Sequence, residues 1–250
     1  MLYGLLFLLI LVVVAGGVYY FFFTGNSCFD KKKNGREEGI DCGGSSCVSC
    51  VLKNAKPLVI SSVEVFENNN KTVTVLGEVR NPNEKVGAKK LVYRVNLFDY
   101  SGKEVFSKIR ETFVYPGKNR TLVEAGINLE AKNIDKAEII FDEVVWQEEK
   151  DFGDVLEKNI VIDKIFLQTG IKEFVVTAAL ANGNPFKVDK IIIKAILFDK
   201  NGLKQNASLT FLESVEAFQS KDFSIRIPLK KEAAARIDPT QTKIIFEIVR

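Results

Sequence analysis

From residue 56 onward, apolar and polar side chains alternate along the chain with a period of two. Val73, Val75 and Val79 fall on one side of such a segment, and Thr74 and Glu78 fall on the other. Because successive side chains of a β-strand point to opposite faces, this pattern predicts strands of about eight to ten residues. Most of the chain is therefore expected to be β-structure.

Short clusters of Asn, Pro, Ser and Gly separate the alternating segments, as expected for tight turns between antiparallel strands. These clusters are Asn68-Asn69-Asn70, Asn81-Pro82-Asn83, Ser101-Gly102, Pro116-Gly117, Asn182-Gly183-Asn184-Pro185 and Asn201-Gly202. One short helix is predicted, near residues 230–237.

The alternating region contains a sequence repeat. Leu97-Phe98-Asp99 recurs as Leu197-Phe198-Asp199, and Ile139-Ile140-Phe141 recurs as Ile244-Ile245-Phe246. Each copy has room for about six or seven strands, a number typical of small antiparallel sandwiches. The sequence therefore predicts a mainly β fold with two tandem immunoglobulin-like antiparallel β-sandwiches.

A charged segment, Gln147 to Asp154, separates the two copies and predicts a domain boundary near residue 150. We assign the first sandwich to residues 56–148 and the second to residues 157–250. Neither copy contains a cysteine, so the packing of apolar side chains must hold each together. Trp146, the only tryptophan, is expected either in the first core or between the sandwiches.

Residues 2–23 carry no charged side chain and are apolar almost throughout. As a helix, a segment of this length crosses a hydrocarbon core of about 30 Å. We therefore predict one N-terminal transmembrane helix, with residues 1–25 as a membrane anchor. A cleaved signal peptide is the alternative, but no Lys or Arg precedes the apolar run. A lipoprotein signal needs a box of small residues before Cys28, which Gly25-Asn26-Ser27 fits poorly.

The four cysteines, Cys28, Cys42, Cys47 and Cys50, all lie close to this apolar segment. Such a cluster forms either disulfides in an oxidising compartment or a metal site in a reducing one. The glycine-rich segment 26–52 has few apolar residues, so covalent bonds are expected to replace a core. Cys28 and Cys42 form no second close pair, which favours disulfides over zinc. All three pairings stay open.

The cysteine-rich segment also resembles a short module of secreted and surface-anchored microbial proteins. The residues that carry this resemblance are Cys28-x-Asp30, Asn34-Gly35-x-Glu37-x-Gly39-Ile40-Asp41-Cys42-Gly43-Gly44 and Cys47-x-x-Cys50. The resemblance covers about a tenth of the chain, in the range of the smallest disulfide-held modules. It implies an extracytoplasmic location and no catalytic activity.

Two signals oppose each other on the orientation of the predicted membrane helix. Lys31, Lys32, Lys33 and Arg36 follow the helix, and the positive-inside rule alone would place the rest of the chain in the cytoplasm. The resemblance of the cysteine module implies the opposite, and we give it precedence. The prediction is a single-pass cell-membrane protein with an extracytoplasmic C-terminal body.

Asp30, Asn34, Glu37 and Asp41 place hard oxygen donors at intervals of three or four residues in a glycine-rich segment. Calcium takes oxygen ligands of this kind, so these residues are candidate calcium ligands. The alternative is that they form turns, because Asp and Asn side chains bond to nearby backbone amides. The spacing does not match the EF-hand loop, and no other cofactor is expected.

Each half of the β region resembles FxLYD-type domains through Val95-x-Leu97-Phe98-Asp99 and Ala195-x-Leu197-Phe198-Asp199. The segment from Gly77 to Asn83 also resembles the G-x-V-x-N-P-N pattern of water-stress and hypersensitive-response domains. Both resemblances imply small β-sandwiches, often tethered to membranes, without an established catalytic centre. Asp99 and Asp199 each precede a turn glycine by three residues, which predicts a structural role in the turn.

Composition excludes several functions. The formal net charge is +3, from 35 Lys and Arg against 32 Asp and Glu, so nothing suggests a nucleic-acid partner. The chain has no histidine, which excludes Ser-His-Asp and Cys-His catalysis and zinc held by histidine. No carboxylate or Ser-Lys motif replaces them, and we predict that the protein is not an enzyme.

Three glycosylation-type sequons begin at Asn70, Asn119 and Asn206. The composition of the chain is that of a folded protein, with 17 Gly and 6 Pro spread along it. These sequons are compatible with an extracytoplasmic body but do not establish one.

The predicted function is that of a membrane-anchored extracytoplasmic binding or structural protein. It presents two β-sandwiches on a disulfide-braced stalk and contacts a protein or envelope partner through sandwich loops or edges. The alternative is an accessory subunit of a membrane-protein assembly or envelope complex. In that case Gly16 and Gly17 would let the membrane helix pack closely against other helices.

Overall fold

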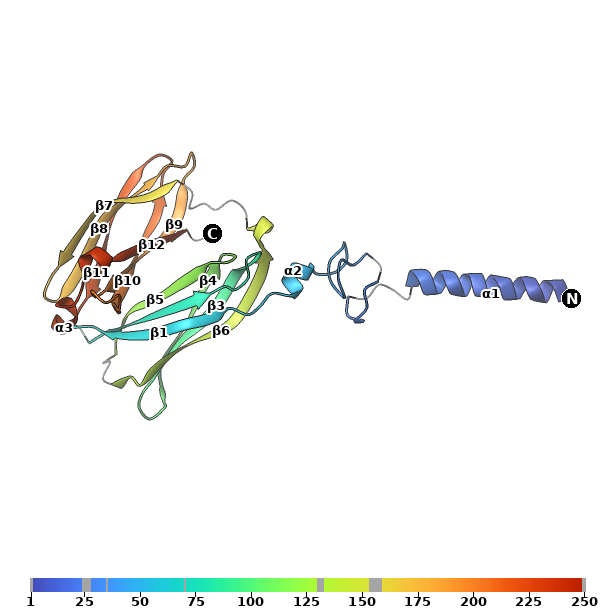
Figure 1. Cartoon of the computed structure of the whole chain (residues 1–250), viewed down its shortest axis with the longest axis horizontal. Coiled ribbons are helices and arrows are strands. Elements are labelled where there is room, and N and C mark those ends of the chain that lie inside the picture. Colours follow the sequence, from blue (N-terminus) through green and yellow to red (C-terminus); the bar gives the residue numbers. More distant parts are fainter. Residues whose placement is uncertain are drawn as a thin grey trace. The chain divides into compact units, whose positions relative to one another are not determined.

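The computed structural model of the chain describes residues 2–23, 28–34, 36–69, 71–129, 133–152 and 159–248. The chain divides into two compact units, Met1–Ala55 and Lys56–Arg250. The predicted mainly β, antiparallel fold is confirmed. Figure 1 colours the chain from blue at the N-terminus to red at the C-terminus.

The first unit begins with the helix α1 (Leu2–Phe23), drawn in blue in Figure 1. Within α1 the burial is described for Gly4 and residues 6–19, and all of these residues are exposed. Across the described residues, no helix combines the length and the apolar character that crossing a membrane requires.

The cysteine-rich segment of the first unit holds two disulfides, Cys28 to Cys47 and Cys42 to Cys50. The prediction of disulfides is therefore confirmed, and the structure selects one of the three pairings. The segment ends in the short helix α2 (Cys50–Lys53), where Ser49 Oγ accepts a hydrogen bond from the Leu52 amide. This N-cap satisfies a backbone donor that the first turn of the helix cannot pair.

Over its described residues, the second unit forms twelve strands and three short helices. The strands are β1 (Val59–Glu67), β2 (Val73–Arg80), β3 (Val86–Phe98), β4 (Glu104–Val114), β5 (Asn119–Ile127), β6 (Lys136–Glu148), β7 (Ile160–Thr169), β8 (Glu173–Asn182), β9 (Val188–Phe198), β10 (Lys204–Val215), β11 (Ser220–Pro228) and β12 (Lys243–Ile248). The helices are η2 (Glu149–Asp151), α3 (Lys231–Ala234) and η3 (Pro239–Gln241).

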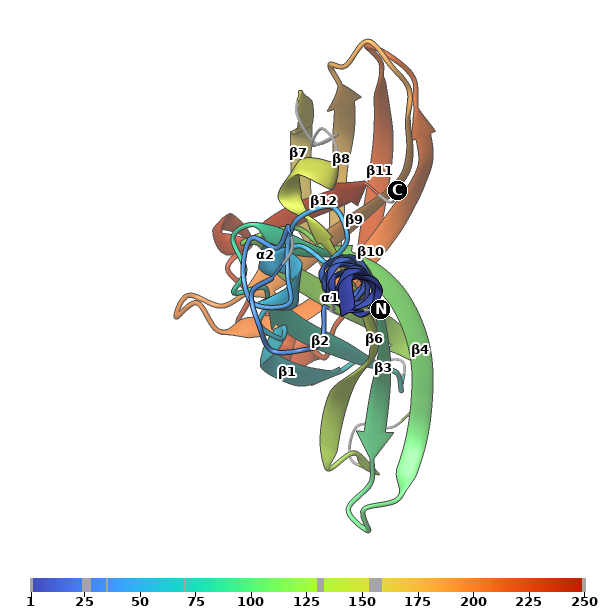
Figure 2. The ribbon, with the colours of Figure 1, turned by 90° about the vertical axis from the view of Figure 1, so that its right-hand side faces the viewer.

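The strands form four antiparallel sheets of three strands each. The first two have the orders β1-β2-β5 and β4-β3-β6, and they enclose one apolar core. The other two, β7-β8-β11 and β10-β9-β12, repeat this arrangement around a second core. We call β1 to β6 the first sandwich and β7 to β12 the second sandwich. Figure 2 shows the two sets of strands from the side.

The alternation predicted from the sequence places side chains in these cores. On β2, Val73, Val75 and Val79 are buried in the first core, and the counterparts on β8 include Phe174 and Val176 in the second core. Burial of such side chains contributes about 1.5 to 3 kcal/mol each and is the main stabilising term. Trp146 is half-buried against the first core, which is one of the two places expected for it.

A buried asparagine organises the same corner of each sandwich. Asn81 Nδ2 donates to the carbonyl oxygens of Val86, at 2.7 Å, and Tyr115, at 3.0 Å. Asn182 makes the same kind of bonds in the second sandwich, including one of 3.1 Å to the carbonyl of Val215. Each asparagine therefore joins loops that are distant in sequence, because its amide supplies donors that the loop carbonyls need.

Asp99 and Asp199 cap the corresponding turns of the two sandwiches. Asp99 Oδ1 accepts from the amides of Ser101 and Lys103, and Asp199 Oδ1 accepts from the amides of Asn201 and Leu203. Four backbone donors are satisfied in this way. The structural role predicted for the two aspartates is confirmed.

The two sandwiches pack against each other through a small apolar cluster, the inter-sandwich interface. Leu76 and Val123 of the first sandwich lie against Ile196 and Ala207 of the second, and all four are buried. Leu76 is one of the residues of β2 whose side chains face away from the first core. The outer face of sheet β1-β2-β5 is thus covered by the outer face of sheet β10-β9-β12.

Polar contacts surround this cluster. Lys204 Nζ lies 2.8 Å from a Glu64 oxygen and 3.1 Å from a Glu78 oxygen. Burial opposes the charge of Lys204, but the hydrogen bonds that its ammonium group donates to the two carboxylates outweigh this effect, so the pKa of Lys204 is raised. Asn206 Nδ2 donates to Asn68 Oδ1 at 2.8 Å. These bonds satisfy the polar groups at the interface and fix how the two sheets meet.

Candidate functional site

The candidate site is a groove of about 790 Å³ that runs along β5. Inward-facing residues of β4, among them Lys108 and Arg110, line one wall, and residues of β9 to β12 line the other. The volume lies within the range of about 300 to 1,000 Å³ that is usual for ligand sites. The groove thus uses both sandwiches and opens where the first sandwich meets the second.

A buried carboxylate stands between two cations in the groove. Glu124 on β5 is only 8% exposed. It accepts from Lys108 Nζ at 2.6 Å and from Arg110 Nε at 2.8 Å, and Arg110 Nη2 completes a bidentate pair at 2.9 Å. The two cations compensate the negative charge of Glu124. The cluster of Glu124, Lys108 and Arg110 therefore has one excess positive charge.

Tyr93 on β3 lies next to this cluster and is 7% exposed. Burial, and then the negative charge of Glu124, raise the pKa of Tyr93 to about 12. The phenol therefore stays protonated at physiological pH and serves as a neutral polar group, not as a base.

A second buried ion cluster lies across the groove. Arg120 Nη2 is 2.9 Å from a Glu247 oxygen, and Lys194 Nζ also pairs with Glu247. Lys194 Nζ donates to the backbone oxygen of Thr121 at 2.6 Å, which ties the second sandwich to the edge of β5. The guanidinium of Arg120 lies 4.2 Å from the centre of the Phe113 ring. Burial lowers the pKa of Lys194 to about 8.

Cations outnumber anions among the residues that line the groove. The cations are Lys108, Arg110, Arg120, Lys194 and Arg226, and the anions are Glu111, Glu124 and Glu247. An excess of positive charge in a partly enclosed site attracts anionic groups, since the low dielectric of the walls weakens screening. The groove is therefore suited to a ligand that carries carboxylates or other oxyanions.

In the second sandwich, the position equivalent to the groove is closed. We call the side of a sandwich between the edge strands of its two sheets the seam; it lies between β4 and β5 in the first sandwich and between β10 and β11 in the second. Strand β10 packs along β11, whereas β4 and β5 have no comparable contact over the described residues. The seam of the first sandwich is thus open.

The residues at the two seams differ in character at equivalent positions. Tyr93 pairs with Arg110 in the strand register, as Ile193 pairs with Thr210. Glu124 pairs with Val75, as Ile225 pairs with Val176. The equivalents of Tyr93 and Glu124 are therefore the fully buried Ile193 and Ile225. A sandwich of this kind closes with apolar residues, so the buried polar set of the first sandwich is not required by the fold.

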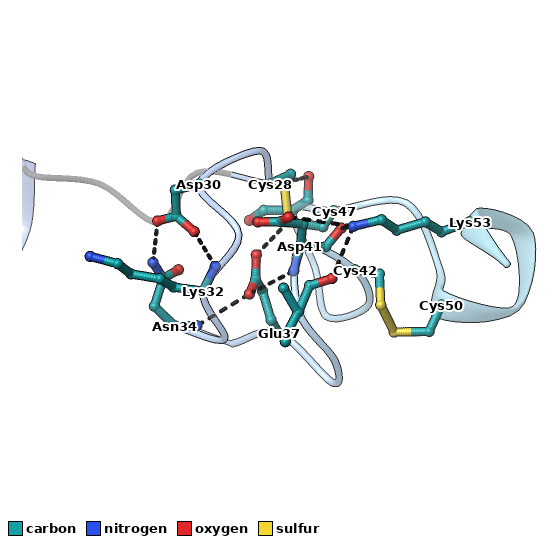
Figure 3. The surroundings of a disulfide bond; sticks show 12 residues. Cys28, Asp30, Lys32, Asn34, Glu37, Asp41, Cys42, Cys47, Cys50 and Lys53 are labelled. Carbon is teal, nitrogen blue, oxygen red and sulfur yellow. Dashed lines mark hydrogen bonds and ion pairs between the residues drawn. A yellow bond between two sulfur atoms is a disulfide. The ribbon is translucent and has the colours of Figure 1, made fainter.

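The candidate calcium ligands act within their own loop, as Figure 3 shows. Asp30 accepts from the Lys32 amide and from Asn34 Nδ2, and Glu37 accepts from the amides of Asn34 and Asp41. These bonds correspond to the alternative in which the residues form turns. The hydrogen bond that Asp30 accepts from the Lys32 amide, and then the bond from Asn34, lower the pKa of Asp30.

The carboxylates of Asp30, Glu37 and Asp41 do not converge on one point. Among the described residues, one set of three acidic or cysteine side chains has its ligand atoms close enough together to hold a metal. This set is Cys28, Glu37 and Cys47. Cys28 and Cys47 are joined in a disulfide, so their sulfurs are not thiolate ligands. The calcium site stays a prediction.

The three sequons have different surroundings. Asn70 lies outside the described residues, and Asn119 is exposed at the start of β5. Asn206 is 1% exposed, and its Nδ2 donates to Asn68 and to the carbonyl of Pro228. A glycan on Asn206 is incompatible with this packing, because the modified nitrogen has no space around it.

Sequence reasoning did not single out Tyr93, Lys108, Arg110 or Glu124. A signal for them was present in the repeat, because polar side chains stand at inward positions where the second copy has Ile193 and Ile225. Aligning the two copies strand by strand, and not only at their matching motifs, would have exposed these exceptions.

Comparison with known proteins gives no family. No family model matches the chain, and no curated protein matches it. Partly similar solved structures include a β-glucuronidase of glycoside hydrolase family 2, with 8% identity and a TM-score of 0.24 over 66% of this chain and 20% of that chain. A red sea bream transglutaminase has 10% identity and a TM-score of 0.26 over 79% of this chain and 32% of that chain.

A third similar structure is the N-terminal tandem CBM22 domain of Paenibacillus barcinonensis Xyn10C, with 10% identity and a TM-score of 0.17. The match covers 79% of this chain and 88% of that chain. The chain spans about a third or less of the β-glucuronidase and the transglutaminase. Similarities at such TM-scores carry no argument about function.

Proposed function

We propose that the protein is a membrane-anchored extracytoplasmic binding protein whose ligand site is the groove at the open seam. Its two immunoglobulin-like sandwiches are held by the apolar segment 2–23 and the disulfide-braced module. The proposal of an anchor rests on the uncharged sequence of residues 2–23, and that of an extracytoplasmic body on the two disulfides.

The observation that carries the binding function is the difference between the two seams. Burying Tyr93 and Glu124 costs free energy that Ile193 and Ile225 do not cost. The polar groups are retained in a groove with an excess of cations. Buried polar groups that the fold does not need are typical of binding sites.

We propose binding, and not catalysis, as the role of this site. Tyr93 is held protonated, and Glu124 and Glu247 are each occupied by two cations. Binding is thus favoured over catalysis. The role of an accessory subunit in a membrane assembly stays open as a form of the same proposal, in which the ligand of the groove is another subunit.

Location is tested by labelling intact cells with a membrane-impermeant maleimide before and after reduction. We expect labelling of Cys28, Cys42, Cys47 and Cys50 only after external reduction. Labelling that occurs without reduction and only after lysis would place the body in the cytoplasm.

Binding is tested with a photo-crosslinking residue placed at Thr112, which lines the groove. A matched variant carries it at Ser224, an exposed position on the outer face of β11. Irradiation of intact cells is expected to give an adduct at position 112 and none at position 224. Equal yields at both positions would contradict a specific site in the groove.

A further inference from the structure

We infer that the groove takes an extended acidic peptide segment, which adds as a strand to the free edge of β4 and pairs its carboxylates with Lys108 and Arg110. This inference rests on the proposed binding function and adds the chemical class of the ligand.

The first argument is the unpaired edge of β4. Among the described strands, β4 pairs only with β3, so its other edge presents backbone N–H and C=O groups without strand partners. Glu111 and Thr112 place this edge at the groove. Exposed edges of this kind accept an added peptide strand through main-chain hydrogen bonds.

Strand β5 is less able to accept such a peptide. The backbone oxygen of Thr121 already accepts a hydrogen bond from Lys194 Nζ at 2.6 Å. A strand added to β5 would have to break this bond. In the second sandwich, β11 itself lies along β10 at the equivalent place. A peptide beside β4 would therefore fill space that the fold closes in its other copy.

The second argument is charge. Lys108 and Arg110 share the single carboxylate of Glu124, and each of their side chains is 39% exposed. A lysine has three N–H donors and an arginine five, so donors remain after the three bonds to Glu124 are made. Carboxylates are the natural partners of such donors, in particular of the planar arginine group.

The third argument is spacing. Lys108 and Arg110 are two residues apart on β4 and point to the same side. A neighbouring strand presents its side chains with the same period of two, so acidic residues at alternate positions of a peptide would stand opposite the two cations. Phe211, 65% exposed on the other wall, offers an apolar surface to the rest of the peptide.

The test measures binding of a fluorescent, end-capped peptide of alternating Val and Glu to the full-length protein by fluorescence polarisation. One control peptide replaces Glu by Lys, and another carries N-methyl groups at alternate amides, which removes the donors needed for strand pairing. We expect the unmodified Glu peptide to bind at least about tenfold more tightly than either control, a ratio equivalent to about 1.4 kcal/mol.

The protein variant combines Lys108→Ser, Arg110→Thr and Glu124→Ile, which introduces the residues of the second seam. It avoids an unpaired buried carboxylate, so it should fold, and it is expected to lose binding of the Glu peptide by tenfold or more. Lys221→Ala, an exposed lysine of β11 outside the groove, is the control and should bind as the unaltered protein does.

Several results would overturn the inference. Equal binding of the N-methylated peptide would exclude strand addition, and equal binding of the Lys peptide would exclude carboxylate recognition. Displacement of the peptide by a short polygalacturonate at lower concentration would make the ligand an acidic glycan instead. If no peptide binds while the crosslinker at position 112 still gives its specific adduct, the ligand class is wrong and the binding function stands.

Discussion

The first and second sandwiches share their strand order, their asparagine corner and their aspartate-capped turn, but they differ at the seam. In the second sandwich Ile193 and Ile225 are buried where β10 meets β11. In the first sandwich Tyr93 and Glu124 occupy these positions beside a groove. Since one chain contains both solutions, the second sandwich is an internal control. It separates what the fold requires from what only the first sandwich needs.

The outer faces of the sheets differ in the same way. Leu76 on β2 is buried by the second sandwich, and its equivalent on β8, Thr177, is exposed. Ile196 on β9 is buried by the first sandwich, and its equivalent on β3 is Asn96, which accepts from Ser107 Oγ. At these two positions the sheets outside the inter-sandwich interface thus carry polar residues, whereas the sheets at the interface carry apolar ones.

The largest effect is expected when the polar residue of the open seam is placed in the closed one. Ile225→Glu puts an unpaired carboxylate into the second core and should lower the free energy of unfolding by about 3 to 5 kcal/mol. Urea unfolding of the full-length protein measures this change. The reciprocal Glu124→Ile should cost less than about 1.5 kcal/mol, because Lys108 and Arg110 remain in contact with water. Equal losses would mean that the seams are equivalent.

Removing the buried asparagine of either sandwich, Asn81 or Asn182, should lower the stability of the protein by a similar amount. Asn81→Ala and Asn182→Ala each leave buried loop carbonyls without donors, so each should lower the free energy of unfolding by about 3 kcal/mol. Chemical denaturation of the two variants checks this. A loss at one corner only would show that the repeat does not extend to this network.

A substitution at the inter-sandwich interface should lower the stability of the protein, whereas a substitution at the equivalent exposed position of β8 should not. Leu76→Thr removes apolar contacts with the second sandwich and is expected to cost about 2 kcal/mol. The control Thr177→Leu changes an exposed face and should stay within about 0.5 kcal/mol of the unaltered protein. Thermal unfolding compares the pair. A substantial loss from Thr177→Leu would point to a contact of β8 beyond those described.

The smallest expected effect concerns pH. Burial lowers the pKa of Lys194 to about 8, from its ordinary 10.5, so between these values the unfolded chain binds more protons than the folded one. The free energy of unfolding should therefore rise with pH in this window, by about 1 kcal/mol for each pH unit between 8 and 10. The raised pKa of Tyr93 acts in the opposite direction, but only above about pH 10.

Lys194→Met is the matched variant for this measurement. It removes the titrating group and keeps an unbranched side chain of similar length at the interface. Its unfolding free energy should be flatter between pH 8 and 10 than that of the unaltered protein. The same slope in both proteins would assign the pH dependence to other groups.

Much of this architecture could be predicted from local sequence. The alternation at Val73, Val75 and Val79 fixes which side chains enter the core, and turn residues such as Asp99 act through bonds to neighbouring amides. The use of cysteines as disulfides also followed from the composition of their segment. Their pairing did not, because four flexible thiols close together allow three combinations, and tertiary geometry chooses one.

The groove could not be predicted in this way. Alternation marks Tyr93 and Glu124 as inward positions, but it does not say whether the opposite sheet closes over them. That depends on how near β4 comes to β5 and on contacts such as that from Lys194 to Thr121, between residues far apart in sequence. The sequons illustrate the same limit, since only the packing shows that Asn206 is buried at the inter-sandwich interface.

Amide hydrogen exchange of the full-length protein tests the open seam most directly. Residues 106–112 of β4 and the equivalent residues 206–212 of β10 are compared in one experiment, so each stretch is the reference for the other. We predict that the amides of β4 exchange faster, because its free edge borders the groove whereas β10 packs along β11. Equal protection of the two stretches would contradict an open seam and the binding site built on it.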